Sequence, residues 1–148
     1  MATLTGLGLR VELPGGWDGR IYGREVAGGT RAALHAGTFP LPGERGDFGS
    51  GAVDVMGSED VLIVLLEYDP ACTAQPLFQA EGPPGALEAE AFSPTVLQRS
   101  LPGQAGSQSF FSTGGRAFCL YVVLGQFANR SRLVPVANRV LARIAVEA

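Results

Sequence analysis

The sequence contains no lysine, and this absence limits the partners that the chain can take. All 11 basic residues are arginines, and they are scattered along 148 residues with only Arg130 and Arg132 close together. The 14 acidic residues outnumber them, which gives a formal net charge of −3. A protein that follows a nucleic-acid backbone needs a continuous stripe of positive charge. The sequence therefore predicts no nucleic-acid partner.

Cysteine and histidine are also scarce, with two cysteines and one histidine. Cys72 and Cys119 lie far apart, so they form neither a CxxC pair nor a disulfide framework, and a lone histidine does not complete a zinc site. We therefore expect no metal ion and no cofactor. Cys119, within the apolar segment FCLYVVL, is predicted to be a small buried hydrophobe, whereas Cys72 lies in a predicted loop as an exposed thiol.

Long apolar runs are missing as well. The longest covers residues 61–66, far short of the roughly 20 residues that span a bilayer. Residues 1–17 have no basic segment followed by an apolar one, as a secretory signal has, so we expect a cytoplasmic protein without a membrane span. Apolar residues make up 46% of the chain and charged residues 17%, which predicts a folded protein, and the length fits one domain over residues 1–148.

Three strands are predicted in the first 39 residues. Residues 7–13 alternate between apolar and polar side chains, and residues 20–26 and 31–39 follow as further strands. The alternation places His35 on the same face as Phe39. The glycine-rich turns between these segments are short, so we expect the three strands to be antiparallel neighbours in one sheet.

The middle of the chain gives weaker signals. Residues 40–51 are predicted to be a long loop, and residues 52–56 a short strand. Residues 61–68 are predicted to be a strand covered on both faces, with a helix that begins at Ser58 as the alternative. Ser93-Pro94 is typical of a helix start, so residues 93–99 are expected to form one or two helical turns.

The last third of the chain is the most regular. Residues 107–112 and 116–124 flank Thr-Gly-Gly, which indicates a β-hairpin whose second strand is apolar on both faces and therefore central. An apolar helical stripe follows, made of Leu133, Val134, Ala137, Val140, Leu141 and Ile144. Pro135 is expected in or just before the first full turn of this helix. The predicted class is α+β, with a mostly antiparallel sheet, the C-terminal helix on one face and short helices or loops on the other.

Both ends of the sequence resemble Mog1/PsbP-like domains. Near the N-terminus, Leu-Pro-Gly-Gly-Trp at residues 13–17 joins two strands, and near the C-terminus a strand over residues 118–124 precedes a helix that ends in Leu-Ala-Arg-Ile. The whole chain also resembles short bacterial proteins of actinobacteria, in keeping with its Ala-, Gly- and Arg-rich composition. The resemblance implies an α/β/α sandwich in which Trp17 plugs the sheet. It implies no catalytic residues, because members of the family are mostly binding or accessory proteins.

A binding surface is predicted from aromatic residues near turns and from the glycine-rich loop. Its candidates are Trp17, Tyr22, His35, Asp47 and Phe48. The Asp-Phe-Gly at residues 47–49 is not a kinase metal loop, because a kinase also needs a lysine on a strand. An alternative is an enzyme that uses His35 as a general base beside Asp47 or Asp54. Residues 59, 60, 67 and 69 are acidic and are expected to be solvated strand ends.

No nucleophile–base pair, metal cluster or phosphate loop can be recognised in this sequence. The leading hypothesis is therefore a non-catalytic protein-binding or adaptor domain that presents a sheet face or residues 40–51 to a protein partner. One alternative is a structural subunit of a larger assembly, which includes a homo-oligomer. Another is a small-ligand-binding protein with a cleft between sheet and helix.

Overall fold

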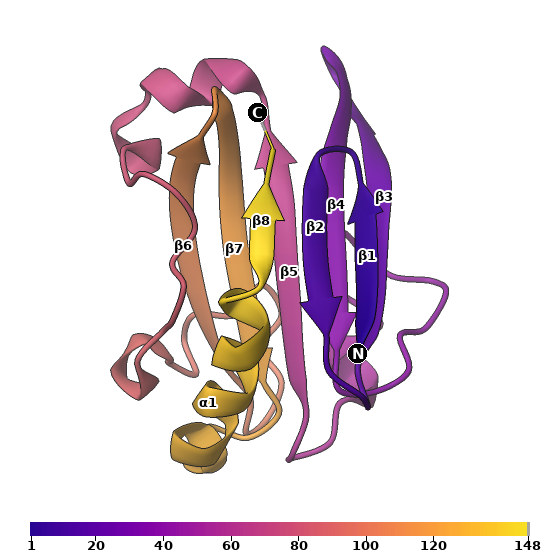
Figure 1. Cartoon of the computed structure of the whole chain (residues 1–148). Helices are drawn as coiled ribbons and strands as arrows, with labels where there is room; N and C mark the ends of the chain where they lie inside the picture. Colours follow the sequence, from indigo (N-terminus) through magenta and orange to yellow (C-terminus); the bar gives the residue numbers. More distant parts are fainter. Residues whose placement is uncertain (148) are drawn as a thin grey trace.

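The larger of two antiparallel sheets has five strands. They are β3 (Asp18–Val26), β4 (Gly29–Gly37), β5 (Val61–Tyr68), β6 (Ala105–Thr113) and β7 (Arg116–Leu124), in the order β3-β4-β5-β7-β6 (Figure 1). The structure, a computed structural model, describes residues 1–147. Tight hairpins join β3 to β4 and β6 to β7, and β5 lies between the two hairpins. Both groups of polar residues described below are built on this sheet.

The smaller sheet joins the two ends of the chain. Its strands are β1 (Ala2–Gly6), β2 (Leu9–Leu13) and β8 (Ile144–Val146), with β2 in the middle. Leu7 and Gly8 turn β1 into β2 with φ values of 51° and 77°. Two successive residues with positive φ are typical of the type I′ turn, whose twist suits a two-residue hairpin.

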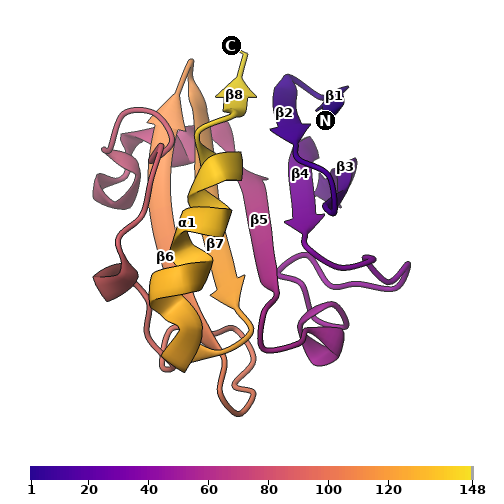
Figure 2. The ribbon, with the colours of Figure 1, turned by 60° about the horizontal axis from the view of Figure 1, so that its bottom comes forward.

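One face of the larger sheet is covered by this small sheet and by the helix α1 (Arg130–Leu141), which follows the short 3-10 helix η5 (Phe127–Asn129) (Figures 1 and 2). The predicted helical stripe is buried here, at Leu133, Val134, Ala137, Val140 and Leu141. It packs in one apolar cluster with β2 and with alternate residues of β5 and β7. Burial of this face supplies the main stabilising contribution for a helix of this length.

The other face of the larger sheet carries a second apolar cluster under loops and 3-10 helices. These short helices are η1 (Val53–Val55), η2 (Pro70–Ala74) and η3 (Pro76–Phe78). The segment that contains η4 (Ala89–Ala91) wraps around the outside of β6, so that Phe92 packs into the first cluster and Leu97 against the second. Within residues 1–147 this second face has no α-helix, so the protein is α+β as predicted, but the second helical layer of an α/β/α sandwich is not confirmed.

The most regular segments were predicted correctly. β5 has the predicted bounds, which makes the alternative helix from Ser58 wrong. The hairpin of β6 and β7 is confirmed, and the two apolar faces of β7 contribute to the two separate clusters. Cys119 is buried as predicted, and burial raises the pKa of its thiol.

Predictions for the N-terminal strands were wrong in their pairing. β2 and β3 lie in different sheets, because β2 pairs with β1 and β8, near the two termini, and does not pair with β3. Leu7 was expected on the buried side of a strand, but it is a turn residue with 50% of its surface exposed. β1 was not predicted at all.

Three further expectations need correction. Residues 53–55 form a 3-10 helix in place of a strand. The predicted helical turns from Ser93 are absent, because the backbone of Ser93 pairs with Gly106 and its hydroxyl accepts from the N–H of Thr95. The last helix begins at Arg130, so Pro135 lies beyond its first turn, and Ile144 leaves the helix to pair with Val11 in the small sheet.

No helix among the described residues has the length and apolarity needed to cross a bilayer.

Candidate binding site

Four of the five predicted site residues lie together on the second face of the larger sheet. Tyr22 comes from β3, His35 from β4, and Asp47 and Phe48 come from the loop that folds back over both strands. Trp17 is separated from them, because it packs against the cluster on the helix side of the sheet. Trp17, which is partly buried, therefore lies apart from the other four residues.

His35 is completely buried, and both of its ring nitrogens have partners. The Nε of Arg45 donates to Nδ1 of His35 at 2.9 Å. Because a guanidinium only donates, Nδ1 must be the unprotonated nitrogen, and the proton lies on Nε2. Nε2 is 2.8 Å from the backbone oxygen of Asp47 and donates to it. His35 thus ties β4 to the loop as a neutral side chain.

The surroundings of His35 oppose its protonation. Burial is the main cause that lowers its pKa below the ordinary value of 6.5, and the charge of Arg45 lowers it further. A second proton would also have to occupy Nδ1, which already accepts from Arg45. A general base needs a free nitrogen, so the predicted alternative of a His35–Asp47 catalytic pair does not fit this geometry. The nearby atom of Asp47 is its backbone oxygen and not its carboxylate.

The carboxylate of Asp47 is held by two neighbouring side chains of β3. Tyr22 Oη donates to its Oδ1 at 2.9 Å, and Arg24 Nε donates to its Oδ2 at 3.1 Å. Arg24 also donates to the backbone oxygen of Glu67 at 3.0 Å, which anchors it in β5. Burial, followed by the contact with Asp47, raises the pKa of Tyr22 to about 12. Tyr22 is therefore a protonated hydrogen-bond donor at neutral pH.

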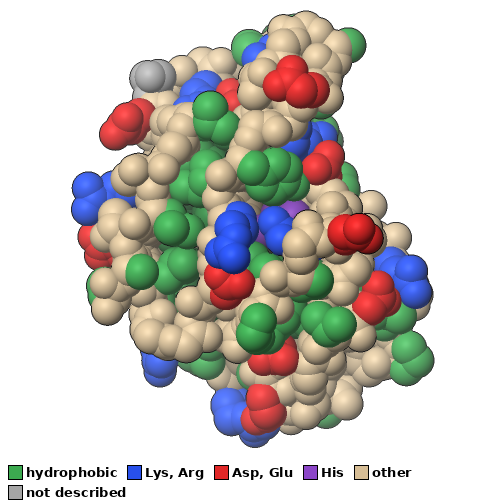
Figure 3. Space-filling model, turned by 90° about the vertical axis from the view of Figure 1, so that its right-hand side faces the viewer, with side chains coloured by type: hydrophobic (Ala, Val, Ile, Leu, Met, Phe, Trp, Pro, Cys, Tyr) green, Lys and Arg blue, Asp and Glu red, His purple; other side chains and the backbone are tan. Residues whose placement is uncertain are grey.

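Two hollows flank this group. One, of about 280 Å³, is lined by Asp47, Phe48, Gln98 and Tyr121 among others, and the rings of Phe48 and Tyr121 meet edge to face at 5.9 Å. The other, of about 390 Å³, is lined by Arg20, Ile21, Tyr22, Gly43 and Arg45 and lies next to β3. Figure 3 looks at this side of the molecule and shows arginine side chains in front of the histidine, with acidic side chains around them.

The two edges of the larger sheet differ in how they are covered. Along β6, Ser93 and Gly106 exchange two backbone hydrogen bonds of 3.0 and 2.9 Å, and residues 80 and 82 bond to Ser112. Along the outer edge of β3, no backbone pairing occurs within residues 1–147. A nine-residue edge strand with unpaired N–H and C=O groups is a template for another strand.

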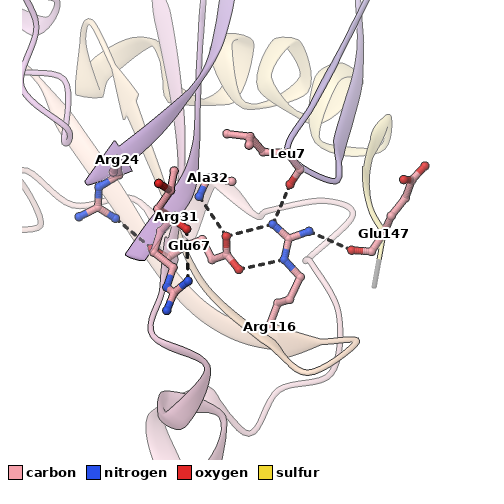
Figure 4. A network of polar contacts seen from close by, with 8 residues as sticks. Leu7, Arg24, Arg31, Ala32, Glu67, Arg116 and Glu147 are labelled. Atoms are coloured by element: carbon pink, nitrogen blue, oxygen red, sulfur yellow. Dashed lines mark hydrogen bonds and ion pairs between the residues drawn. The ribbon is translucent and has the colours of Figure 1, made fainter. Parts of the chain in front are cut away.

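A second polar group, the clamp of Glu67 and Arg116, lies on the opposite side of the sheet (Figure 4). The two nitrogens of Arg116 that face Glu67 donate to its carboxylate at 2.9 and 3.0 Å, and the backbone N–H of Ala32 donates to the same carboxylate at 3.0 Å. Arg116 also donates to the backbone oxygens of Leu7 and Glu147, each at 2.9 Å. The clamp thus fastens one end of the small sheet, where the β1–β2 turn lies beside the end of β8, to β5 and β7.

Glu67 was expected to be a solvated strand end, and this prediction was wrong. Only 8% of its surface is exposed. Burial pushes the pKa of Glu67 upward, but the hydrogen bonds from Arg116 and Ala32 outweigh it, and the pKa lies below the usual value. Arg116 makes four hydrogen bonds inside the protein, and both carboxylate oxygens of Glu67 accept, which indicates a structural role.

The sequence also missed two residues of the binding site itself. Arg24 follows Tyr22 by two positions in a strand, so alternation along β3 predicts that both point to the same face. Arg45 lies in an irregular loop, where no periodic signal indicates its direction. In the described part of the chain, no group of three or more His, Cys, Asp or Glu side chains is placed to hold a metal ion.

Comparison of the chain with protein-family models, with curated proteins and with solved structures finds no match. The resemblance to Mog1/PsbP-like domains stays a prediction.

Proposed function

We propose that this protein is a non-catalytic binding domain that accepts an extended segment of a partner protein along the outer edge of β3. The observation that carries the proposal is the contrast between the two edges of the larger sheet. The chain pairs the edge of β6 with its own backbone at two points, Gly106 and Ser112, and leaves the edge of β3 unpaired over residues 18–26. Addition of a strand to such an edge is a common way to recognise a peptide.

The backbone of β3 is oriented for this pairing. Val26 and Gly29 close the hairpin, so alternation along the antiparallel ladder directs the backbone groups of Ile21, Gly23 and Glu25 away from β4. The same alternation directs the N–H of Ala32 in β4 away from β3. In agreement with this, that N–H donates to Glu67 of β5, the strand on the other side of β4. The oxygen of Gly19, which also points outward, accepts from the Arg20 side chain at 2.7 Å.

Side chains beside this edge are held in place before a partner arrives. Tyr22, Arg24, Asp47 and His35 are linked by hydrogen bonds of 2.8–3.1 Å between the strands and the loop. A site whose side chains are already ordered loses less conformational entropy when it binds. The absence of an available base at His35 favours binding over catalysis.

A second copy of the chain fits this edge less well than a different protein. Antiparallel pairing of two β3 strands over their full length would place Arg20 of one copy opposite Arg24 of the other. Like charges directly opposite each other destabilise a strand pair. The preferred partner is therefore a heterologous segment.

The test uses random dodecapeptides displayed on phage and selected on the wild-type protein. Selected peptides are then titrated by fluorescence anisotropy against Glu25→Pro and Thr30→Pro. Both variants lose the hydrogen bond between Thr30 and Glu25, but only Glu25→Pro removes an outward N–H from β3. We expect Glu25→Pro to weaken binding at least about tenfold, a loss of about 1.4 kcal/mol, and Thr30→Pro to leave it nearly unchanged. Selection of no peptide, or equal binding by both variants, would refute the proposal.

For the fold family, we also propose a divergent Mog1/PsbP-like sandwich in which 3-10 helices and loops replace the second helical layer. The C-terminal helix on one face of an antiparallel sheet and the position of Trp17 support this. A cytoplasmic location stays a prediction, which fractionation of the native host can test.

A further inference from the structure

Arg45 has a fixed orientation but only neutral partners. Its Nε donates to the neutral His35 at 2.9 Å, and its Nη1 donates to the backbone oxygen of Pro42 at 2.5 Å. These two contacts come from β4 and from the loop itself, so they hold the plane of the guanidinium without cancelling its charge. A guanidinium has five N–H donors, and Nη2 has no partner among the described residues.

The two arginines of β3 each have a carboxylate partner. Arg20 pairs with Asp18 at 2.6 Å and Arg24 pairs with Asp47 at 3.1 Å. Asp47 is further engaged by Tyr22, and Asp18 also accepts from the N–H of Leu41 at 2.8 Å. Within residues 1–147, Arg45 has no carboxylate within the 4.0 Å of an ion pair, although it is partly buried.

The unpaired charge lines the hollow of about 390 Å³ beside β3. Arg20, directly opposite His35 in the strand register, lines it too, together with Ile21 and Tyr22. Side chains of a strand alternate between its faces, so every second side chain of a segment paired with β3 would point to the face of the sheet on which this hollow lies. The hollow is therefore placed where a partner's side chain would arrive.

We infer that the hollow at Arg45 binds a carboxylate, and that the segment accepted by β3 carries an Asp or Glu side chain at the position facing it. The inference rests on the proposed function, because it names the chemistry of the same partner. A planar carboxylate matches the remaining donors of a guanidinium, and such charge-assisted pairs are stronger than bonds between neutral groups. His35, kept neutral by burial, holds Arg45 without competing for its charge.

One experiment separates this inference from the proposed function. Peptides selected on the wild-type protein are sequenced, and one glutamate-containing peptide is compared with its glutamine analogue by fluorescence anisotropy. We expect the glutamate peptide to bind at least about tenfold more tightly, and Arg45→Gln to abolish that preference while the glutamine analogue still binds. Arg132→Gln, which removes an exposed arginine of α1 paired with Glu59, is the matched control and should keep the preference.

The outcomes distinguish the two statements. Peptides that depend on the β3 edge but show no acidic preference, or a preference that survives in Arg45→Gln, would overturn the inference and leave the proposed function standing. A failure to select any edge-dependent peptide would refute both proposals.

Titration with sodium acetate against sodium chloride at equal ionic strength tests the hollow alone. A saturable shift of the Arg45 Nε–H resonance supports the inference, and equal shifts in both salts count against it.

Discussion

The two polar groups on opposite sides of the larger sheet use the same residue types in different ways. In the clamp of Glu67 and Arg116, a guanidinium meets a carboxylate, and its remaining contacts are to backbone oxygens of Leu7 and Glu147. In the candidate binding site, the guanidinium of Arg45 meets a neutral histidine and one carbonyl oxygen. A charge that is compensated inside the fold stabilises it, whereas a charge that is oriented but uncompensated is available to a ligand.

The largest expected effect is on the clamp. Glu67→Gln leaves the Arg116 side chain, only 15% exposed, without its carboxylate. We expect the free energy of unfolding in urea to fall by about 3 kcal/mol. The control is Glu59→Gln, because Glu59 and Arg132 form a pair with side chains 59% and 61% exposed, where the loss should stay under about 1 kcal/mol. Equal losses in the two variants would contradict a structural role for the clamp.

A second, smaller effect should follow from crowding the clamp. Gly8 has φ of 77°, and a Cβ added to it would lie 2.3 Å from Nη1 of Arg116. Gly8→Ala should therefore destabilise the protein by about 2 kcal/mol, through backbone strain and displacement of Arg116. Gly15→Ala is the matched control, since nothing lies within 4 Å of its added Cβ and its φ is not positive. Thermal unfolding followed by circular dichroism compares them, and an unchanged Gly8→Ala would refute the close contact.

The pH dependence should distinguish the buried histidine from the clamp. The folded-state pKa of His35 lies below 6.5, so the unfolded chain binds more protons than the folded one at pH values between the two. The contribution of His35 to the free energy of unfolding should therefore be fully present above about pH 6.5. It should decrease as the pH falls, with a slope of at most about 1.4 kcal/mol per pH unit.

His35→Gln should remove that slope, as measured by urea unfolding between pH 7.5 and pH 5. Loss of stability through Glu67 begins lower, below its ordinary value of about 4.5, because its folded pKa is depressed. An unaltered slope in His35→Gln would mean that another group causes it.

The smallest expected effect is on the stability of Arg45→Gln. Its partners are neutral and the side chain is partly exposed, so the free energy of unfolding should change by less than about 1 kcal/mol. Chemical denaturation measures this value. A loss near that of Glu67→Gln would show that Arg45 is mainly structural and would weaken the contrast between the two polar groups.

Sequence reasoning found most of the binding site but not its charges. Tyr22, His35, Asp47 and Phe48 were selected as aromatic, titratable or loop residues, and the fold brings them together. Trp17 was selected by the same criteria and lies elsewhere. Arg45 was missed because its importance depends on what it lacks, a carboxylate partner, and only the folded chain determines the partners of a loop residue.

The sequence by itself determined the local elements with strong periodicity. Alternation identified β4, continuous apolarity identified β5 and the two buried faces of β7, and the 3.6-residue period identified α1, because these patterns reflect which sides of an element are buried.

Only the tertiary structure decided which strands share a sheet. β2 pairs with β8, more than 130 residues away in Leu9↔Val146, and that pairing drew Ile144 out of the helical stripe. The same long-range assembly brings Leu7, Glu67, Arg116 and Glu147 into one clamp and leaves the edge of β3 unpaired. Such contacts depend on how elements distant in the chain are placed relative to one another, and a local sequence pattern does not indicate that placement.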